Sequence, residues 1–120
     1  MVEKMKTLAE ERGSAEVQFM LGFIYAVGRE VPQDDKEAVK WYRKAANQGY
    51  AEGQVALGMM YAEGRGVPQD NEVAYFWTKL AAKQDRAYIK RRNLLYQRLS
   101  PEQRERAQKR AREWRPISPE

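Results

Sequence analysis

Two aspartates, Asp34 and Asp70, are the residues whose repetition first suggests chemistry. They lie 36 residues apart in identical Val-Pro-Gln-Asp segments, and paired carboxylates can serve as a general acid and a general base. Each aspartate, however, stands immediately before an amphipathic segment, where an N-cap side chain contributes about 1 kcal/mol to helix stability. No partner base accompanies either of them. We therefore interpret both as helix caps and predict no catalytic residue.

Composition excludes several other kinds of chemistry. The 120 residues include no cysteine and no histidine, which excludes thiol nucleophiles, imidazole bases and the usual zinc ligand sets. Gly64-Arg65-Gly66 faintly resembles a phosphate-binding loop, but it lacks the Lys-Ser/Thr pair and the preceding strand of such loops. We predict no metal site and no cofactor. A hydrolase with a carboxylate site is the least favoured interpretation, since no nucleophile–base set is present.

The chain repeats itself with a period of 36 residues. Residues 51–86 align with residues 15–50, and 18 of the 36 positions are identical. A fixed period of about 20 to 50 residues is typical of arrays in which each unit buries its apolar face against its neighbours. Aromatic residues recur at that period, which favours core packing over a ligand cage. These aromatic residues are Tyr25, Trp41, Tyr61 and Trp77.

Helical spacing and stop signals define the expected elements. Gly28 and Pro32 separate the two helices of the first repeat. Asp34 with Glu37 forms a capping box at the start of the second of these helices. Ser100 caps the last helix in the same way, through Gln103. We expect helices over residues 2–12, 15–27, 35–47, 51–63, 71–83, 87–99 and 101–114.

These elements predict one all-α domain over residues 1–120. Because the first helix aligns with the second helix of each repeat, the chain opens on a helix without its mate. The domain divides into an N-terminal helix remnant (1–14), two repeats (15–50 and 51–86), a C-terminal capping helix pair (87–115) and a tail (116–120) that follows the last helix.

The recurring pattern resembles the Sel1-like repeat, a relative of the tetratricopeptide repeat with a longer loop between its two helices. The first unit departs from the pattern at Glu30, which stands where the second has Gly66. The second lacks the final glycine, because Asp85 stands where the first has Gly49. We expect Asp85 in the left-handed conformation, at a cost of about 1 kcal/mol, and a turn or a tightening of the array at this point. The second unit carries most of the pattern, in Leu57, Gly58, Tyr61, Gly64, Gly66, Val67, Asp70, Ala74, Trp77, Ala81 and Ala82.

The resemblance implies a right-handed α-solenoid of antiparallel helix pairs. It also implies a scaffold or adaptor that holds other proteins or peptides. Bacterial members often act at the envelope or as partners of secreted factors.

The resemblance further implies where a partner would lie. In a tetratricopeptide-like stack the concave surface is formed by the side of each first helix that is not used for packing. Several of the residues on this surface are apolar and would form a strip along it. We predict that this apolar strip binds a peptide or protein partner. The alternative is that the solenoid curls and buries the strip on itself. The corresponding positions are Glu16, Phe19 and Phe23, then Glu52, Val55 and Met59, then Tyr88, Arg91 and Leu95.

The net charge of +5 is concentrated in the last third of the chain. Residues 1–84 carry 11 basic and 12 acidic side chains, whereas residues 85–120 carry 11 basic and 5 acidic ones. This basic third could bind nucleic-acid phosphates, with Tyr88 and Tyr96 stacking on bases. It could also steer an acidic protein partner towards the chain.

The charges of the last helix are spaced for pairing within that helix. Glu102 with Arg106 and Glu105 with Lys109 are i,i+4 pairs of the kind found on solvated helices. We therefore favour a charged, solubilising cap over a nucleic-acid site.

The ends of the chain carry little information about compartment. The longest apolar run, residues 19–27, is half of the roughly 18 residues that a membrane span needs, and the first residues do not form a secretory signal. Localisation stays open between the cytoplasm and, if a signal has been removed, the periplasm. We expect the unpaired N-terminal helix to expose Met5, Leu8 and Phe19 to another copy, which leaves self-association open.

Overall fold

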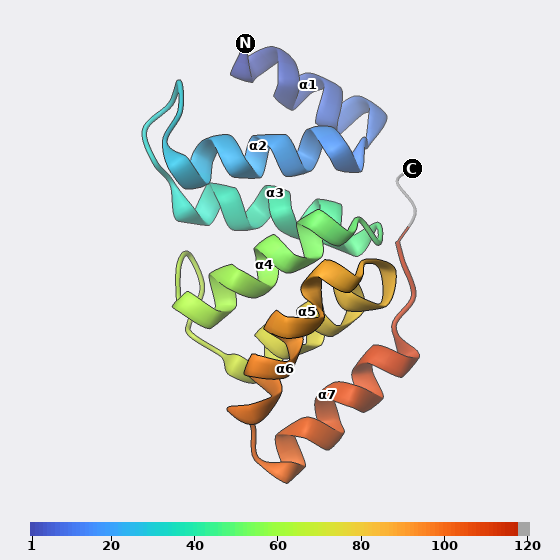
Figure 1. The fold of residues 1–120 in the computed structure, drawn as a ribbon. Coiled ribbons are helices and arrows are strands. Elements are labelled where there is room, and N and C mark those ends of the chain that lie inside the picture. Colours follow the sequence, from blue (N-terminus) through green and yellow to red (C-terminus); the bar gives the residue numbers. More distant parts are fainter. Residues whose placement is uncertain (118–120) are drawn as a thin grey trace.

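The structure, a computed structural model, describes residues 1–117 as a stack of seven α-helices (Figure 1). From α1 to α6 each helix packs against the next, and α7 packs against α5. The described regular elements are all helical, as expected from the sequence. The stack measures 45 × 28 × 23 Å. The elements are α1 (Val2–Arg12), α2 (Ala15–Val27), α3 (Asp35–Asn47), α4 (Ala51–Glu63), α5 (Asn71–Gln84), the short 3-10 turn η1 (Arg86–Tyr88), α6 (Ile89–Gln97) and α7 (Pro101–Glu113).

The core runs through the stack along the inward faces of these helices. Trp41 is fully buried and Trp77 is 6% exposed, so both tryptophans lie inside, as their recurrence predicts. Leu21 and Leu57, one repeat apart, are also fully buried. Each unit thus contributes the same residue types to a shared apolar interior.

The two helices of each pair approach closely at a glycine. At Gly58 on α4, a β-carbon would lie 2.8 Å from the Thr78 hydroxyl and 3.1 Å from the Ala74 carbonyl oxygen, both on α5. In the first pair the equivalent Gly22 lies under the ring of Tyr42. A larger residue at either position would push the paired helices apart.

Glutamines join successive pairs in a recurring network. The Gln48 amide donates to the Gly13 carbonyl at 2.7 Å and to the Gln18 side chain at 2.8 Å. One repeat later, Gln84 donates to the Gly49 carbonyl at 2.8 Å and to Gln54 at 3.2 Å. Gln18 and Gln54 are buried, so these bonds satisfy polar groups that would otherwise be costly to bury.

The helix caps agree with the sequence except at one side chain. Asp34 accepts a hydrogen bond from the Glu37 backbone N–H at 3.1 Å, and Ser100 with Gln103 forms the complete predicted capping box. The Glu37 carboxylate instead accepts from Trp41 Nε1 at 3.3 Å. The capping box predicted at Asp34 is therefore half wrong, because the buried indole N–H recruits the carboxylate.

The predicted left-handed conformation of Asp85 is wrong. Its φ is −143° and its ψ is 119°, which is extended backbone, and its side chain accepts a hydrogen bond from the Ala87 N–H at 2.9 Å. Asp85 thus starts η1 and turns the chain before α6, which begins at Ile89 rather than at Ala87. The aspartate acts as a cap for a turn that the first repeat does not have.

Both ends of the chain pack on the stack. Met5 and Phe19 pack against the core, contrary to the expectation that they are exposed, whereas Leu8 is 38% exposed. At the other end the Ile117 N–H donates to the Asn47 carbonyl at 2.6 Å. Ile117, in the predicted tail, therefore lies against the end of α3, and residues 118–120 of that tail lie outside the described residues.

Candidate functional site

A hollow of about 320 Å³ lies between α2 and α4, and we call it the first hollow. Six of the nine predicted positions line it: Phe19, Phe23, Glu52, Val55, Met59 and Tyr88. The Phe19 ring is held 5.8 Å from the rings of Tyr42 and Tyr50. Phe23 is 47% exposed at the mouth, whereas Val55 is 9% exposed at the floor. The lining is mostly apolar and can receive a bulky apolar side chain.

A second hollow of about 220 Å³ lies beside the first and shares Met59 and Glu63 with it. It contains two further predicted residues, the exposed Arg91 and the buried Leu95, together with the exposed Arg98. We call it the second hollow.

The two hollows are repeat-related. Met59, Ala62, Arg91 and Leu95 of the second hollow lie 36 residues after Phe23, Ala26, Val55 and Met59 of the first. The same site therefore occurs twice along one groove. In the second copy arginine replaces Val55, so the groove changes from apolar to basic along its length.

Glu16 is the predicted site residue that lines neither hollow. It is exposed in the first turn of α2. The pKa of the nearby Tyr50 is raised mainly by burial and then by the negative charges of Glu52 and Glu16. The two carboxylates thus make this end of the groove acidic.

Tyr42, on α3, lines the first hollow although it is not among the predicted site residues. It is 5% exposed, and burial raises the pKa of its hydroxyl to about 12. Its ring reaches the hollow because Gly22 leaves room for it. The sequence held a signal for this role. The residue 36 positions after Tyr42 is Thr78, so the aromatic side chain does not recur here, whereas it does recur at Trp41 and Trp77.

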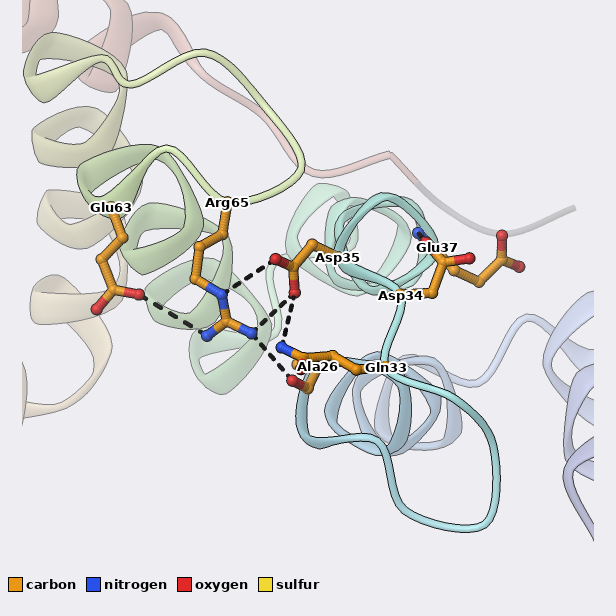
Figure 2. Close-up of polar contacts among 7 residues, drawn as sticks. All are labelled: Ala26, Gln33, Asp34, Asp35, Glu37, Glu63 and Arg65. Carbon is orange, nitrogen blue, oxygen red and sulfur yellow. Dashed lines mark hydrogen bonds and ion pairs between the residues drawn. The ribbon is translucent and has the colours of Figure 1, made fainter.

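Arg65, in the loop after α4, also lines the first hollow without having been predicted as a site residue. Figure 2 shows its guanidinium between the N-terminal end of α3 and the C-terminal end of α2. It donates to both Asp35 oxygens at 2.8 and 3.3 Å and to the Ala26 carbonyl at 2.9 Å, and Glu63 lies 3.8 Å away. Hydrogen bonding to Arg65 lowers the pKa of Asp35. The bidentate pair fixes the loop at the rim of the first hollow.

Several cations of the basic third are engaged within the fold. Arg106 pairs with Glu72 at 2.8 Å, not with Glu102 as its spacing predicted. The guanidinium carbons of Arg104 and Arg110 lie 4.1 and 4.5 Å from the ring centroids of Tyr96 and Phe76. These contacts occupy side chains that a nucleic-acid surface would present to phosphates.

Residues 1–117 contain no group of three His, Cys, Asp or Glu side chains placed to hold a metal ion. In the same range no helix is both long and apolar enough to cross a membrane.

Comparison with known proteins assigns the fold to a family. A family model described as the Sel1 repeat matches residues 15–50 and 51–85. The chain belongs to the Sel1 repeat family. Sel1 repeat proteins generally mediate protein–protein interactions and are typically non-enzymatic scaffolds. The resemblance seen in the sequence and the α-solenoid fold are thereby confirmed.

Two solved structures of Sel1-like fold are similar to this chain. The first is c5321, a protective antigen of uropathogenic Escherichia coli strains, with a TM-score of 0.88 and 32% identity over 94% of this chain and 24% of that one. The second is a Sel1 repeat protein from Oxalobacter formigenes, with a TM-score of 0.69 and 37% identity over 73% of this chain and 37% of that one. The chain therefore spans about a quarter and about a third of these relatives. Among the curated proteins no match is found.

Proposed function

We propose that this Sel1 repeat chain is a non-catalytic module that holds a segment of a partner protein along the groove. The segment places a bulky apolar side chain in the first hollow and an acidic side chain over Arg91 and Arg98 in the second. The observation that carries the proposal is the repetition of one hollow in two chemical forms, apolar and basic.

Burial of an apolar anchor supplies the affinity in this proposal. A fully buried Leu, Met or Phe side chain gains about 1.5–3 kcal/mol from leaving water. The first hollow is held in shape by the aromatic contacts of Phe19 and by the ion pair of Arg65 with Asp35. Little ordering is then needed on binding, which leaves more of that gain as affinity.

The positive charges of Arg91 and Arg98 favour an acidic side chain on the partner segment. Neither Arg91 nor Arg98 forms an ion pair within residues 1–117. A carboxylate placed between two guanidinium groups accepts charge-assisted hydrogen bonds. The acidic group also fixes the direction in which the segment lies, because the opposite end of the groove carries Glu16 and Glu52.

A nucleic-acid site on the basic third is the alternative function. It is less favoured because Arg104, Arg106 and Arg110 already contact Tyr96, Glu72 and Phe76 of the same chain. Titration with single- and double-stranded oligonucleotides at rising salt separates the two functions. The groove proposal expects no saturable binding even at low salt.

The first prediction concerns the apolar anchor. Selection of peptides from a display library against the purified chain should enrich a bulky apolar residue with Asp or Glu nearby. The double substitution Phe23→Glu with Met59→Glu should abolish this enrichment, because it puts two carboxylates into the first hollow. Circular dichroism and thermal melting should change little, since Phe23 is 47% exposed and Met59 is half-buried.

A matched control is available on the same helix. Met20 on α2 is 46% exposed and lines neither hollow, so Met20→Glu should retain peptide binding. Arg91→Glu with Arg98→Glu should keep the apolar preference and lose the acidic one. Unfolding of the Phe23/Met59 variant would show that these residues are core and would refute the proposal, as would equal loss of binding in the Met20 control.

A further inference from the structure

A third cavity, of about 290 Å³, lies away from the groove, between α5, α6 and α7. Tyr75 and Lys79 line it from α5, Arg92, Asn93 and Tyr96 from α6, and Gln108 from α7. None of the six lines either hollow of the groove. Every one of these side chains can donate a hydrogen bond.

Two cations, Lys79 and Arg92, line this cavity. Lys79 is half-buried, and the charged groups that act on it are Arg92, Lys83 and Arg112. Burial and then the repulsion of these cations lower the pKa of Lys79. Within residues 1–117 none of the four cations forms an ion pair. Lys83 and Arg112 are exposed, but Lys79 and Arg92 are half-buried, and two half-buried like charges without a counter-charge disfavour each other's charged form.

The equivalent cation of the first repeat has a partner within the fold. Arg43, 36 residues before Lys79, donates to the Tyr61 hydroxyl at 2.7 Å, and its guanidinium carbon lies 5.6 Å from the ring centroid of Tyr61. No such acceptor bonds the Lys79 ammonium in the described part of the chain. The cation at this repeat position is therefore bound by the chain itself in the first repeat, at Arg43, and is open to a ligand in the second, at Lys79.

The cavity also has polar groups arranged around these cations. The Arg92 guanidinium donates to Asn93 Oδ1 at 2.9 and 3.1 Å, which orients both side chains at the cavity wall. The rings of Tyr75 and Tyr96, whose centroids lie 5.7 Å apart, line the same cavity. Residues with ammonium, guanidinium, hydroxyl and amide donors thus line the cavity from three helices.

We infer that this cavity binds a phosphate group, either free or as the end of a small phosphate ester. A phosphate carries close to two negative charges near neutral pH, and its oxygens accept several charge-assisted hydrogen bonds. It therefore offsets more of the local positive charge than a carboxylate does. The cavity is larger than the phosphate group itself, which leaves room for a small organic group.

Inorganic phosphate is the probe for the second prediction. Amide NMR spectra of the whole chain, recorded while phosphate replaces chloride at constant ionic strength, should show saturable shifts centred on Lys79, Arg92 and Gln108. The pKa of Lys79, followed through its side-chain carbon shift, should rise when phosphate binds, because a bound anion favours the charged ammonium. Acetate should bind more weakly.

Two charge-matched double variants test the site. Lys79→Gln with Arg92→Gln should weaken phosphate binding by at least about tenfold. Arg29→Gln with Lys36→Gln removes the same charge from exposed cations outside the cavity and should leave binding unchanged. Lys79→Arg keeps the charge and should keep phosphate binding, which preserves the test if the first variant fails to fold.

Three results would overturn the inference. One is a set of linear, non-saturating shifts spread over the basic third. Another is equal weakening in both double variants. The third is an oligonucleotide that binds more tightly than inorganic phosphate and shifts the outer face of α7, which would assign the cations to a nucleic-acid backbone instead. The first two outcomes leave the peptide-binding groove unaffected, since the two sites share no residue. The third would also count against the proposed function, which expects no saturable oligonucleotide binding.

Discussion

Two equivalent loop residues, Glu30 and Gly66, adopt the same left-handed backbone with different side chains. Their φ angles are 63° and 73°. A β-carbon at Gly66 would lie 2.5 Å from the Asp35 carbonyl oxygen and 3.0 Å from a Val39 methyl carbon, whereas Glu30 is exposed. The loop geometry therefore comes from the shared Val-Pro-Gln-Asp segment rather than from glycine alone.

The third prediction compares substitutions at these two positions. Glu30→Gly should stabilise the chain by about 0.5–1 kcal/mol, because relief of the left-handed strain exceeds the added entropy of the unfolded chain. Gly66→Ala should destabilise it by about 2–4 kcal/mol, since strain and collision with α3 add. Urea denaturation of both variants measures the difference. If both substitutions changed the free energy of unfolding by an equal amount, loop packing against α3 would be unimportant.

At the residue scale, the sequence predicted what a residue does within its own helix or turn. Asp34, Trp41 and Trp77 were assigned correctly because a cap and a recurring core position depend on nearby spacing. Asp85 was assigned incorrectly, because whether it continues the repeat depends on the turn that follows. The role of Tyr42 was incomplete because it depends on the space above Gly22, on another helix.

At the element scale, the ion pair of Arg65 with Asp35 joins the second repeat to the first across 30 residues of sequence. Asp35 begins α3, and Arg65 lies in the loop after α4 (Figure 2). Helix bounds followed closely from stop signals, but this contact did not. Both side chains look like ordinary surface charges until the stacking of helices brings them together.

The fourth prediction is a pH-dependent effect of this ion pair. Arg65→Gln should lower the free energy of unfolding by about 1 kcal/mol at pH 7, the range expected for a partly exposed, bidentate pair. The pKa of Asp35 is lowered from 3.8 in the folded chain. Its stabilising contribution is therefore present above the unfolded pKa and lost as pH falls through the folded value.

Urea midpoints of wild type and variant at pH 7, 4 and 3 measure this effect. The difference between the two chains should shrink on acidification below about pH 4 as Asp35 becomes protonated. Lys36→Gln, which removes an exposed cation near the same helix end, is the control. A difference that stays constant down to pH 3 would show that Arg65 acts through packing rather than through charge.

At the scale of the whole molecule, the repeat period predicted the fold and much of the groove lining. Phe19, Phe23, Val55 and Met59 lie together because helices that repeat in sequence stack in register. The division of the groove into the first and the second hollow could not be predicted. It depends on the burial of Leu95, which lies on α6, and α6 departs from the repeat. The domain divisions, the binding role of the groove and self-association through the N-terminal helix remain predictions.

The central claim, that the first hollow receives the partner's apolar side chain, is tested most directly by methyl NMR. The chain has five methionines, of which Met59 and Met60 line the first hollow and Met1, Met5 and Met20 do not. With ¹³C-methyl methionine and a display-selected peptide, we expect contacts from the peptide's apolar side chain to the Met59 and Met60 methyl groups, with Met20 unmoved. Saturable peptide binding that leaves Met59 and Met60 unshifted would contradict the account.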